Sequence, residues 1–341
     1  MERSPAGRFR ELDVLRGLAA LSVVFFHYSF HGTRYFNNYP FFFWPGEYGV
    51  HLFFVISGFV IYYTIERSRT VQDFLFSRFS RLYPTYWVAL AILFVWAVLD
   101  PARRLWWHAF AVNFTMLQRF VDFPDVDTVY WTLGVELVFY AVMTLVFLFG
   151  QMHRIVIVGL AWLAAGTAWG CVHHFNVLDD HSIGNTYFIL PYAPYFVAGV
   201  MFYLIYSRGL RVLYAGTIAL AAAVVWLIQG PLVFGITLFI FGIFALAVAG
   251  WLRFLVNPVT LWLGAISYPL YLVHRQPGYA FLNWMNAHHQ SHWLTLSLAT
   301  GAALVAGYLL SIGVERPAMR ALRAWYRRRG GHAQPVPSTS T

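Results

Sequence analysis

Ten apolar runs, each long enough to cross a lipid bilayer as a helix, constrain the fold of this chain more than any other feature. A hydrocarbon core of about 30 Å needs roughly 20 consecutive apolar residues. The runs cover residues 12–30, 48–65, 84–100, 128–150, 155–173, 187–206, 212–229, 231–249, 259–276 and 293–314. Only 11% of the residues are charged, whereas soluble domains carry about 25%. Because a backbone inside lipid must form its own hydrogen bonds, the runs predict an all-α polytopic membrane protein, a bundle of about ten transmembrane helices.

The distribution of arginine predicts the orientation of this bundle. The chain has no lysine, and its 23 basic residues are all arginine. With the N-terminus in the cytoplasm, 17 of them fall on the inner side and four on the outer side, while Arg16 and Arg275 fall within runs. Since cytoplasmic loops are enriched in basic residues, we expect a multi-pass protein of the cell inner (plasma) membrane with both termini in the cytoplasm. The net charge of +9 then reflects proximity to membrane lipids and needs no nucleic-acid partner.

The organisation along the chain is simple. The apolar runs predict a membrane domain over residues 1–320, followed by a basic cytoplasmic tail over residues 321–341. The end of this tail, residues 330–341, is rich in Gly, Pro, Ser and Thr, a composition typical of disorder. Cys171 is the one cysteine, which excludes an internal disulfide framework.

A polar pair stands out in the first apolar run. Arg16 and His27 are eleven residues apart, which is three helical turns, so both side chains fall on one stripe of the helix, roughly 16 Å apart along its axis. Charged and ionisable groups inside a membrane span are costly and by default mark a functional path. Snorkelling of Arg16 toward the inner interface is the alternative.

Three further polar residues are predicted at the depth of His27. Glu136 is the one acidic residue well inside a run, Ser57 reaches a similar depth in the second run, and His274 lies near the outer end of the ninth. A histidine with a carboxylate partner is a common arrangement for a general base or a nucleophile. Ser57 and His274 each have an alternative reading as structural residues that let helices pack or hydrogen bond.

Six short motifs occur in order along the chain. They are Arg-x10-His, Phe-Phe with Ser-Gly-Phe, Arg-x-x-Arg-Leu-x-Pro, Trp-Thr-Leu-x-x-Glu, Ser-Tyr-x-x-Tyr-Leu-x-His and Glu-Arg-Pro. Their residues are Arg16, His27, Phe53, Phe54, Ser57, Gly58, Phe59, Arg78, Arg81, Leu82, Pro84, Trp131, Thr132, Glu136, Tyr140, Ser267, Tyr268, Tyr271, His274, Glu315, Arg316 and Pro317. With these motifs, residues 11–317 resemble the acyltransferase-3 family of integral membrane acyltransferases. One position departs from the family pattern: His51 stands where many members have Asp.

The resemblance implies an O-acyltransferase that moves an acyl group, acetyl in particular, from cytoplasmic acyl-CoA to a hydroxyl of a glycan or a glycosylated small molecule. His27 would then act as general base or carry the acyl group transiently, with Glu136 orienting its ring. Arginine forks suit phosphates. The residues expected to bind the donor are Arg16, Arg78, Arg81 and Ser57. The residues expected to bind the acceptor are Trp131, Tyr268 and His274.

Two other functions also fit membrane-embedded polar residues. A transporter or exporter of a glycan or lipid would use Arg, His and Glu as a path, although the sequence has no internal repeat. The second alternative is a membrane sensor or scaffold. The clustering of polar groups at one depth of the membrane argues against it, because such a protein would not need that clustering. We expect no metal, because His288, His289 and His292 have no carboxylate or cysteine nearby.

Overall fold

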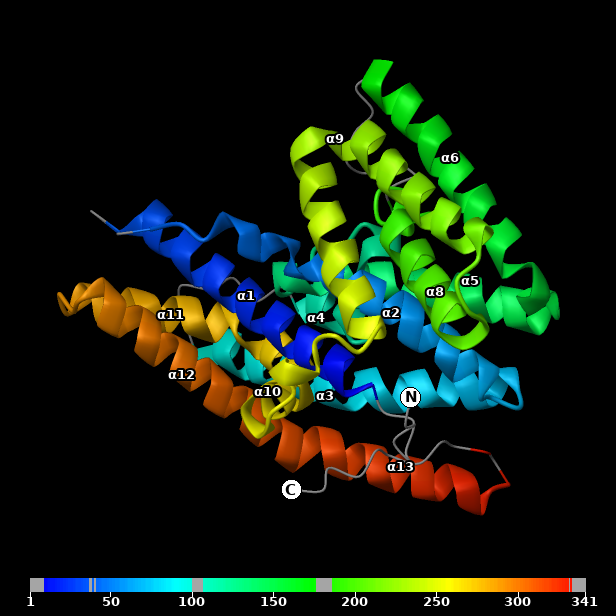
Figure 1. Cartoon of the computed structure of the whole chain (residues 1–341). Helices are drawn as coiled ribbons and strands as arrows, with labels where there is room; N and C mark the ends of the chain where they lie inside the picture. Colours follow the sequence, from blue (N-terminus) through cyan, green and yellow to red (C-terminus); the bar gives the residue numbers. More distant parts are fainter. Residues whose placement is uncertain are drawn as a thin grey trace. The chain divides into compact units, whose positions relative to one another are not determined.

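A computed structural model describes residues 9–36, 39, 41–99, 107–175, 186–330 and 332 (Figure 1). Throughout these residues the regular structure is helical, which confirms the all-α prediction. The principal helices are α1 (Arg10–Tyr35), α2 (Gly49–Glu66), α3 (Val71–Leu99), α4 (Trp107–Asn113), α5 (Trp131–Leu148), α6 (Ile155–Phe175), α8 (Ala193–Arg208), α9 (Val212–Val248), α10 (Pro258–Val273), α11 (Arg275–Ala287), α12 (His292–Leu310) and α13 (Arg316–Arg328).

Seven helical segments of the described chain are long and apolar enough to cross a membrane, so the protein is a multi-pass membrane protein. The predicted count of ten is not confirmed. Two of the ten runs belong to α9, which is one 37-residue helix with a kink at Gly230, where φ is 82° and Pro231 follows. Helices α8 and α10 have 16 residues each, which is short of the roughly 20 that a span needs.

The chain folds into two compact units. The first unit comprises Met1–Val50, Leu75–Trp131 and Leu255–Thr341, and the second comprises His51–Phe74 and Thr132–Phe254. At the C-terminal end, α13 continues to Arg328, across the boundary predicted at residue 320. The predicted disorder of residues 330–341 falls almost entirely outside the described residues.

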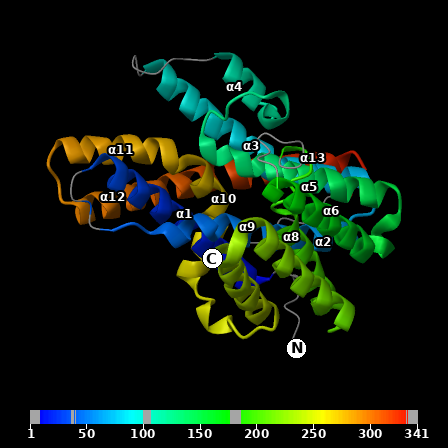
Figure 2. The same ribbon diagram turned by 90° about the horizontal axis from the view of Figure 1, so that it is seen from above.

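In the first unit, α1 and α10 lie side by side (Figure 2). Two glycines permit this contact: a Cβ atom on Gly17 would lie 2.6 Å from the backbone nitrogen of Gly264, and one on Gly264 would overlap the backbone of Asp13. Helix α10 begins at a capping box, in which Asn257 accepts hydrogen bonds from the backbone of Val259 and Thr260. The close approach brings the side chains on facing stripes of the two helices within hydrogen-bonding distance.

The C-terminal part of the first unit continues this bundle. Helix α11 packs along α12, as both views show (Figures 1 and 2). Helix α12 leads into α13 through a π-helical turn, Ser311–Glu315. Such turns insert an extra residue into the helical ladder and redirect a side chain. Glu315 is the last residue of this turn, and its side chain is 1% exposed.

The second unit is built around α2, α5 and α8. A Cβ atom on Gly58 would lie 3.1 Å from the Cα atom of Gly199, so α2 and α8 are in backbone contact. Helix α9 covers α8 and α6, and a hydrogen bond of 3.1 Å joins the hydroxyls of Tyr195 and Thr237. Gly58 belongs to the Ser-Gly-Phe motif, so that motif positions the preceding Ser57 against its neighbours.

The contact of α1 with α10 yields a stability prediction. Gly264→Ala should lower the melting temperature of the detergent-solubilised protein, because the added Cβ overlaps backbone; overpacking typically costs about 1–3 kcal/mol. Gly301→Ala is the matched control, since a Cβ there meets nothing within 4 Å and alanine favours the helix by about 0.5–1 kcal/mol. Equal melting temperatures for Gly264→Ala and Gly301→Ala would refute the close contact.

Candidate active site

The junction of α10 and α11 holds His274, which is fully buried. Tyrosine hydroxyls fix this junction: Tyr28 donates to the carbonyl of His274 at 2.8 Å, and Tyr130 donates to that of Leu272 at 3.2 Å. In turn, Tyr271 donates to the carbonyl of Val129 at 2.9 Å. Because these bonds come from α1 and from the segment before α5, the backbone around His274 is held from several sides.

His27 contacts His274 through its Nδ1 atom. This atom lies 3.2 Å from Nε2 of His274 and 3.0 Å from the carbonyl oxygen of Val23. Nδ1 of His274 lies 2.9 Å from the carbonyl of Tyr271, and a carbonyl only accepts. His274 therefore carries its proton on Nδ1 and presents the lone pair of Nε2 to His27. His27 then carries its own proton on Nδ1.

This tautomer leaves Nε2 of His27 unprotonated. In the described part of the first unit, that atom has no hydrogen-bond partner. The His27 side chain is half-buried. A neutral imidazole with one nitrogen held as a donor and the other open is the form that accepts a proton or attacks a carbonyl carbon. The arrangement is therefore competent for either role predicted from the sequence.

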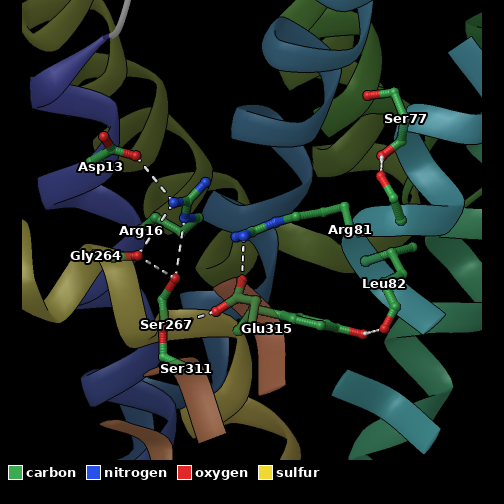
Figure 3. Close-up of polar contacts among 11 residues, drawn as sticks. Asp13, Arg16, Ser77, Arg81, Leu82, Gly264, Ser267, Ser311 and Glu315 are labelled. Carbon is green, nitrogen blue, oxygen red and sulfur yellow. Dashed lines mark hydrogen bonds and ion pairs between the residues drawn. The ribbon is translucent and has the colours of Figure 1, made fainter. Parts of the chain in front are cut away.

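Arg16, on the same stripe of α1 as His27, also faces α10 (Figure 3). Its Nε donates to Ser267 at 3.1 Å, and one terminal nitrogen donates to Asp13 at 3.0 Å and to the carbonyl of Gly264 at 3.2 Å. These contacts hold the guanidinium between the two helices and differ from the snorkelling alternative. Ser267 belongs to one of the six motifs, but nothing in the sequence pairs it with Arg16.

Near this group, Arg81 of α3 forms an ion pair with Glu315 (Figure 3). Ser311 donates to the other carboxylate oxygen of Glu315 at 3.1 Å, so both oxygens are engaged. Tyr268 donates to the carbonyl of Leu82 at 2.9 Å, and the Arg81 guanidinium lies 5.8 Å from the Tyr268 ring centroid. Arg81 and Tyr268, predicted to bind donor and acceptor, are thus also parts of the contact between α3 and α10.

Arg78, the other arginine of the Arg-x-x-Arg motif, has a different environment. One terminal nitrogen donates to the neighbouring Ser77 at 3.0 Å. Its Nε atom is buried and has no partner among the described residues. Because a buried donor without an acceptor costs about 1–3 kcal/mol, Arg78 is the member of the motif that is open to an added acceptor.

A second ion pair lies beside the His274 junction. Arg275 donates to Asp127 at 3.0 Å, and Asp127 is fully buried. Burial lowers the pKa of Arg275, but the adjacent carboxylate of Asp127 more than offsets this, so the net shift is upward. Sequence reasoning missed this pair. Asp127 lies in a connection and Arg275 falls in a predicted span, and nothing in their spacing links them.

In the second unit, Glu136 of α5 is paired with α2. Ser57 donates to Oε1 of Glu136 at 2.7 Å, and Tyr140, one turn along α5, donates to the same oxygen at 2.5 Å. Oε2 has no partner in the described part of this unit. Ser57, Glu136 and Tyr140 all belong to the six motifs. They form one hydrogen-bonded cluster that engages only one of the two carboxylate oxygens of Glu136 within the described part of this unit. The sequence predicted a common depth for Ser57 and Glu136, and it did not predict the contribution of Tyr140.

The remaining predictions concern Trp131 and metals. Trp131 is half-buried and begins α5. Among the residues that the structure describes, no group of three or more His, Cys, Asp or Glu side chains is arranged to hold a metal ion.

Comparisons with known proteins identify related chains. The family model described as "Acyltransferase domain" matches residues 9–314. The chain is 24% identical to "Nodulation protein 10" of Rhizobium leguminosarum bv. viciae, with 92% of this chain and 94% of the relative covered. It is 28% identical to "Acyltransferase MdmB" of Streptomyces mycarofaciens, over 86% and 85% of the two chains. It is 31% identical to "Exopolysaccharide production protein ExoZ" of Rhizobium meliloti (strain 1021), over 67% and 75%. No solved structure matches the chain.

The Arg81 pair yields a second stability prediction. Glu315→Gln should destabilise the protein by about 3 kcal/mol, the lower end of the cost of removing one partner from a buried ion pair, because Arg81 is left uncompensated. Arg81→Gln combined with Glu315→Gln should recover part of that loss. Thermal unfolding in detergent measures the stability loss in the single variant and its partial recovery in the double variant. A double variant less stable than the sum of the two single losses would contradict the pairing.

Proposed function

This chain belongs to the acyltransferase-3 family of integral membrane acyltransferases, and on that premise we propose that it is an acyl-CoA-dependent O-acyltransferase. The donor is an acyl-CoA, acetyl-CoA in particular, on the cytoplasmic side. The acceptor is a hydroxyl of a carbohydrate or of a glycosylated small molecule. Membership of an acyltransferase family, with relatives matched along almost the whole chain, argues against the alternative of a transporter.

The observation that carries the proposed mechanism is the open Nε2 atom of His27. We assign His27 as the general base. Nε2 takes the proton of the acceptor hydroxyl while the hydroxyl oxygen bonds to the thioester carbonyl carbon. The carbon–sulfur bond then breaks, and the imidazolium returns its proton to the departing thiolate. The products are the acylated acceptor and the free thiol of coenzyme A.

His274 is assigned as a positioning residue in this mechanism, in place of the predicted role in binding the acceptor. Both of its ring nitrogens are engaged, one with Tyr271 and one with His27. Its lone pair selects the reactive tautomer of His27 and shares the positive charge when His27 is protonated. The hydroxyls that anchor the His274 backbone keep that lone pair aimed at Nδ1 of His27.

Glu136 is proposed as the second catalytic residue. Its Oε1 atom accepts from Ser57 and Tyr140, which lowers the cost of keeping a carboxylate in an apolar helix. Its open Oε2 atom is available to stabilise positive charge that develops during the reaction. Ser57, predicted to bind the donor, acts in this proposal by orienting Glu136.

Family membership also underlies the contacts that we propose for the donor and the acceptor. Arg16, Arg78 and Arg81 are proposed to face the coenzyme A donor, and Trp131 and Tyr268 the acceptor. One relative bears the name "Exopolysaccharide production protein", which supports a polysaccharide as acceptor. The excess of arginine on one side of the bundle supports a plasma-membrane location with both termini in the cytoplasm.

Loss of His27 tests the catalytic proposal. His27→Ala and Glu136→Gln should each abolish acyl transfer from radiolabelled acetyl-CoA to a glycan acceptor, while the amount of protein in the membrane stays near normal. The double variant should be little worse than either single one, since residues acting as a unit are not additive. Arg328→Gln, an exposed change on α13, serves as control. Full activity in His27→Ala would remove the mechanism.

The same assay separates a base from an acyl carrier. Without acceptor, a protein whose His27 carries the acyl group should retain label after rapid denaturation, and His27→Ala should retain none. If His27 is instead a general base, the wild-type protein should stay unlabelled, and coenzyme A thiol should be released rapidly only when the acceptor is present. We expect the second result, and stoichiometric labelling of wild-type protein would overturn it.

A further inference from the structure

An apolar pocket lies in the second unit between α5, α6 and α8, which lie together in both views (Figures 1 and 2). Its volume is about 280 Å³, and it is partly open to the surroundings of the protein. Among its lining residues, the one side-chain nitrogen or oxygen is Nε1 of Trp162, which already donates to the carbonyl of Phe188 at 3.0 Å. Sites for polar ligands present several placed polar groups. This lining therefore suits an apolar occupant and not a sugar or a nucleotide.

Aromatic rings and a glycine keep this pocket open. The ring of Phe139 stacks on that of Phe196, with 4.3 Å between centroids, and on that of Trp162, with 6.3 Å. On α6, Gly159 adds no side chain, and a Cβ atom there would lie 3.1 Å from a methyl group of Val197. Well-packed interiors leave few voids larger than a water molecule. A space that fixed rings and a glycine preserve is therefore shaped for an occupant.

Acyl chains of the bilayer have access to this part of the molecule. In the span Gln151–Val172, which includes α6, only 28% of the apolar window is buried, so most of this helix faces outward. Ile157, between two lining residues, is 63% exposed. Lipid tails are as apolar as leucine. An acyl chain that enters from the bilayer thus matches the lining and needs no polar contact inside the pocket.

Two basic residues mark the end of the α5–α6 hairpin at which the pocket lies. His153 and Arg154 are exposed and directly precede Ile155, a lining residue that begins α6. Residues 149–154 include no Asp or Glu, and Arg154 has no hydrogen bond or ion pair with the residues that the structure describes. Gly159 follows Arg154 by five residues, roughly 7 Å along the helix. A positive group at the end of the span thus lies directly above an apolar pocket.

We propose that this pocket binds one acyl chain of an anionic phospholipid whose phosphate contacts Arg154. A guanidinium fork matches phosphate oxygens in charge and geometry, and basic residues near the membrane surface favour anionic lipids. The phosphate at the interface and the chain below it follow the order of Arg154 and the pocket along α6. The inference goes beyond the proposed function and does not depend on it.

A bound chain would also support the catalytic helix of this unit. It would pack against Phe139, which lies on α5 one turn after Glu136 and next to Tyr140. The lipid would then stiffen the helix that carries the hydrogen-bonded cluster of Ser57, Glu136 and Tyr140. We therefore expect a melting temperature that rises when the lipid binds, since a ligand that binds only the folded protein stabilises it.

Native mass spectrometry of the full-length protein in detergent, titrated with phosphatidylglycerol or phosphatidylcholine, tests the phosphate contact. Wild-type protein should bind a first molecule of phosphatidylglycerol more tightly than one of phosphatidylcholine. Arg154→Gln should weaken phosphatidylglycerol binding about fivefold, the effect of one basic residue near an anionic lipid, and should weaken phosphatidylcholine binding less. Arg211→Gln removes an exposed arginine elsewhere in the same unit and should leave both affinities within about twofold.

Filling the pocket tests the site of the acyl chain. Gly159→Leu places a side chain in the pocket and should abolish both the tight binding of phosphatidylglycerol and the rise in melting temperature that it causes. Gly216→Leu is the matched control on α9, because a Cβ atom there meets nothing within 4 Å, and it should retain both effects. Phosphatidylglycerol with a diazirine in its acyl chain gives a readout on the wild-type protein. Its cross-links should fall on residues 139–143 and 155–162.

Four outcomes would overturn the proposal. Equal wild-type affinities for the two lipids would remove the phosphate contact. Equal losses in Arg154→Gln and Arg211→Gln would indicate general surface charge. Wild-type binding in a folded Gly159→Leu would show that the chain lies elsewhere. Cross-links confined to other helices would show the same, even if Gly159→Leu does not fold. None of these measurements requires turnover, so each outcome leaves the proposed function standing.

Discussion

The backbone contact between α1 and α10 is the interaction on which the polar contacts of Arg16 and His27 depend. Gly17 and Gly264 let the helices approach until no side chain separates them. At that separation, Arg16 reaches Ser267 and His27 reaches His274. A larger residue at either glycine would move both pairs apart, because they lie along the same seam. Two small residues thus set the separation within the Arg16–Ser267 pair and within the His27–His274 pair.

Charge compensation explains much of the rest. In an apolar environment an ion is stable only with a counterion or several hydrogen bonds. Arg16, Arg81 and Arg275 each have a carboxylate within the first unit.

Some of the fold and site could be predicted from sequence, for local reasons. Apolar runs predict helices because lipid leaves the backbone no other partner. The eleven-residue spacing of Arg16 and His27 predicts a shared stripe because the helical period is fixed. The span count was less predictable. A kink at Gly230 joins two runs in one helix, and hydropathy does not distinguish a kink from a loop. Tyr140 could be related to Glu136 by its four-residue spacing, but nothing local selects that contact.

By itself, the sequence determined that the protein is a helical membrane acyltransferase and which residues carry its motifs. Only the tertiary structure decided which of these residues touch. His274 contacts His27 because α10 ends beside α1, and Arg81 pairs with Glu315, the last residue of the π-helical turn between α12 and α13. The ring stack of Phe76 on Tyr326 likewise places α13 on α3. Periodicity fixes the face of each helix, whereas the pairing of faces depends on side-chain packing between segments far apart in the chain.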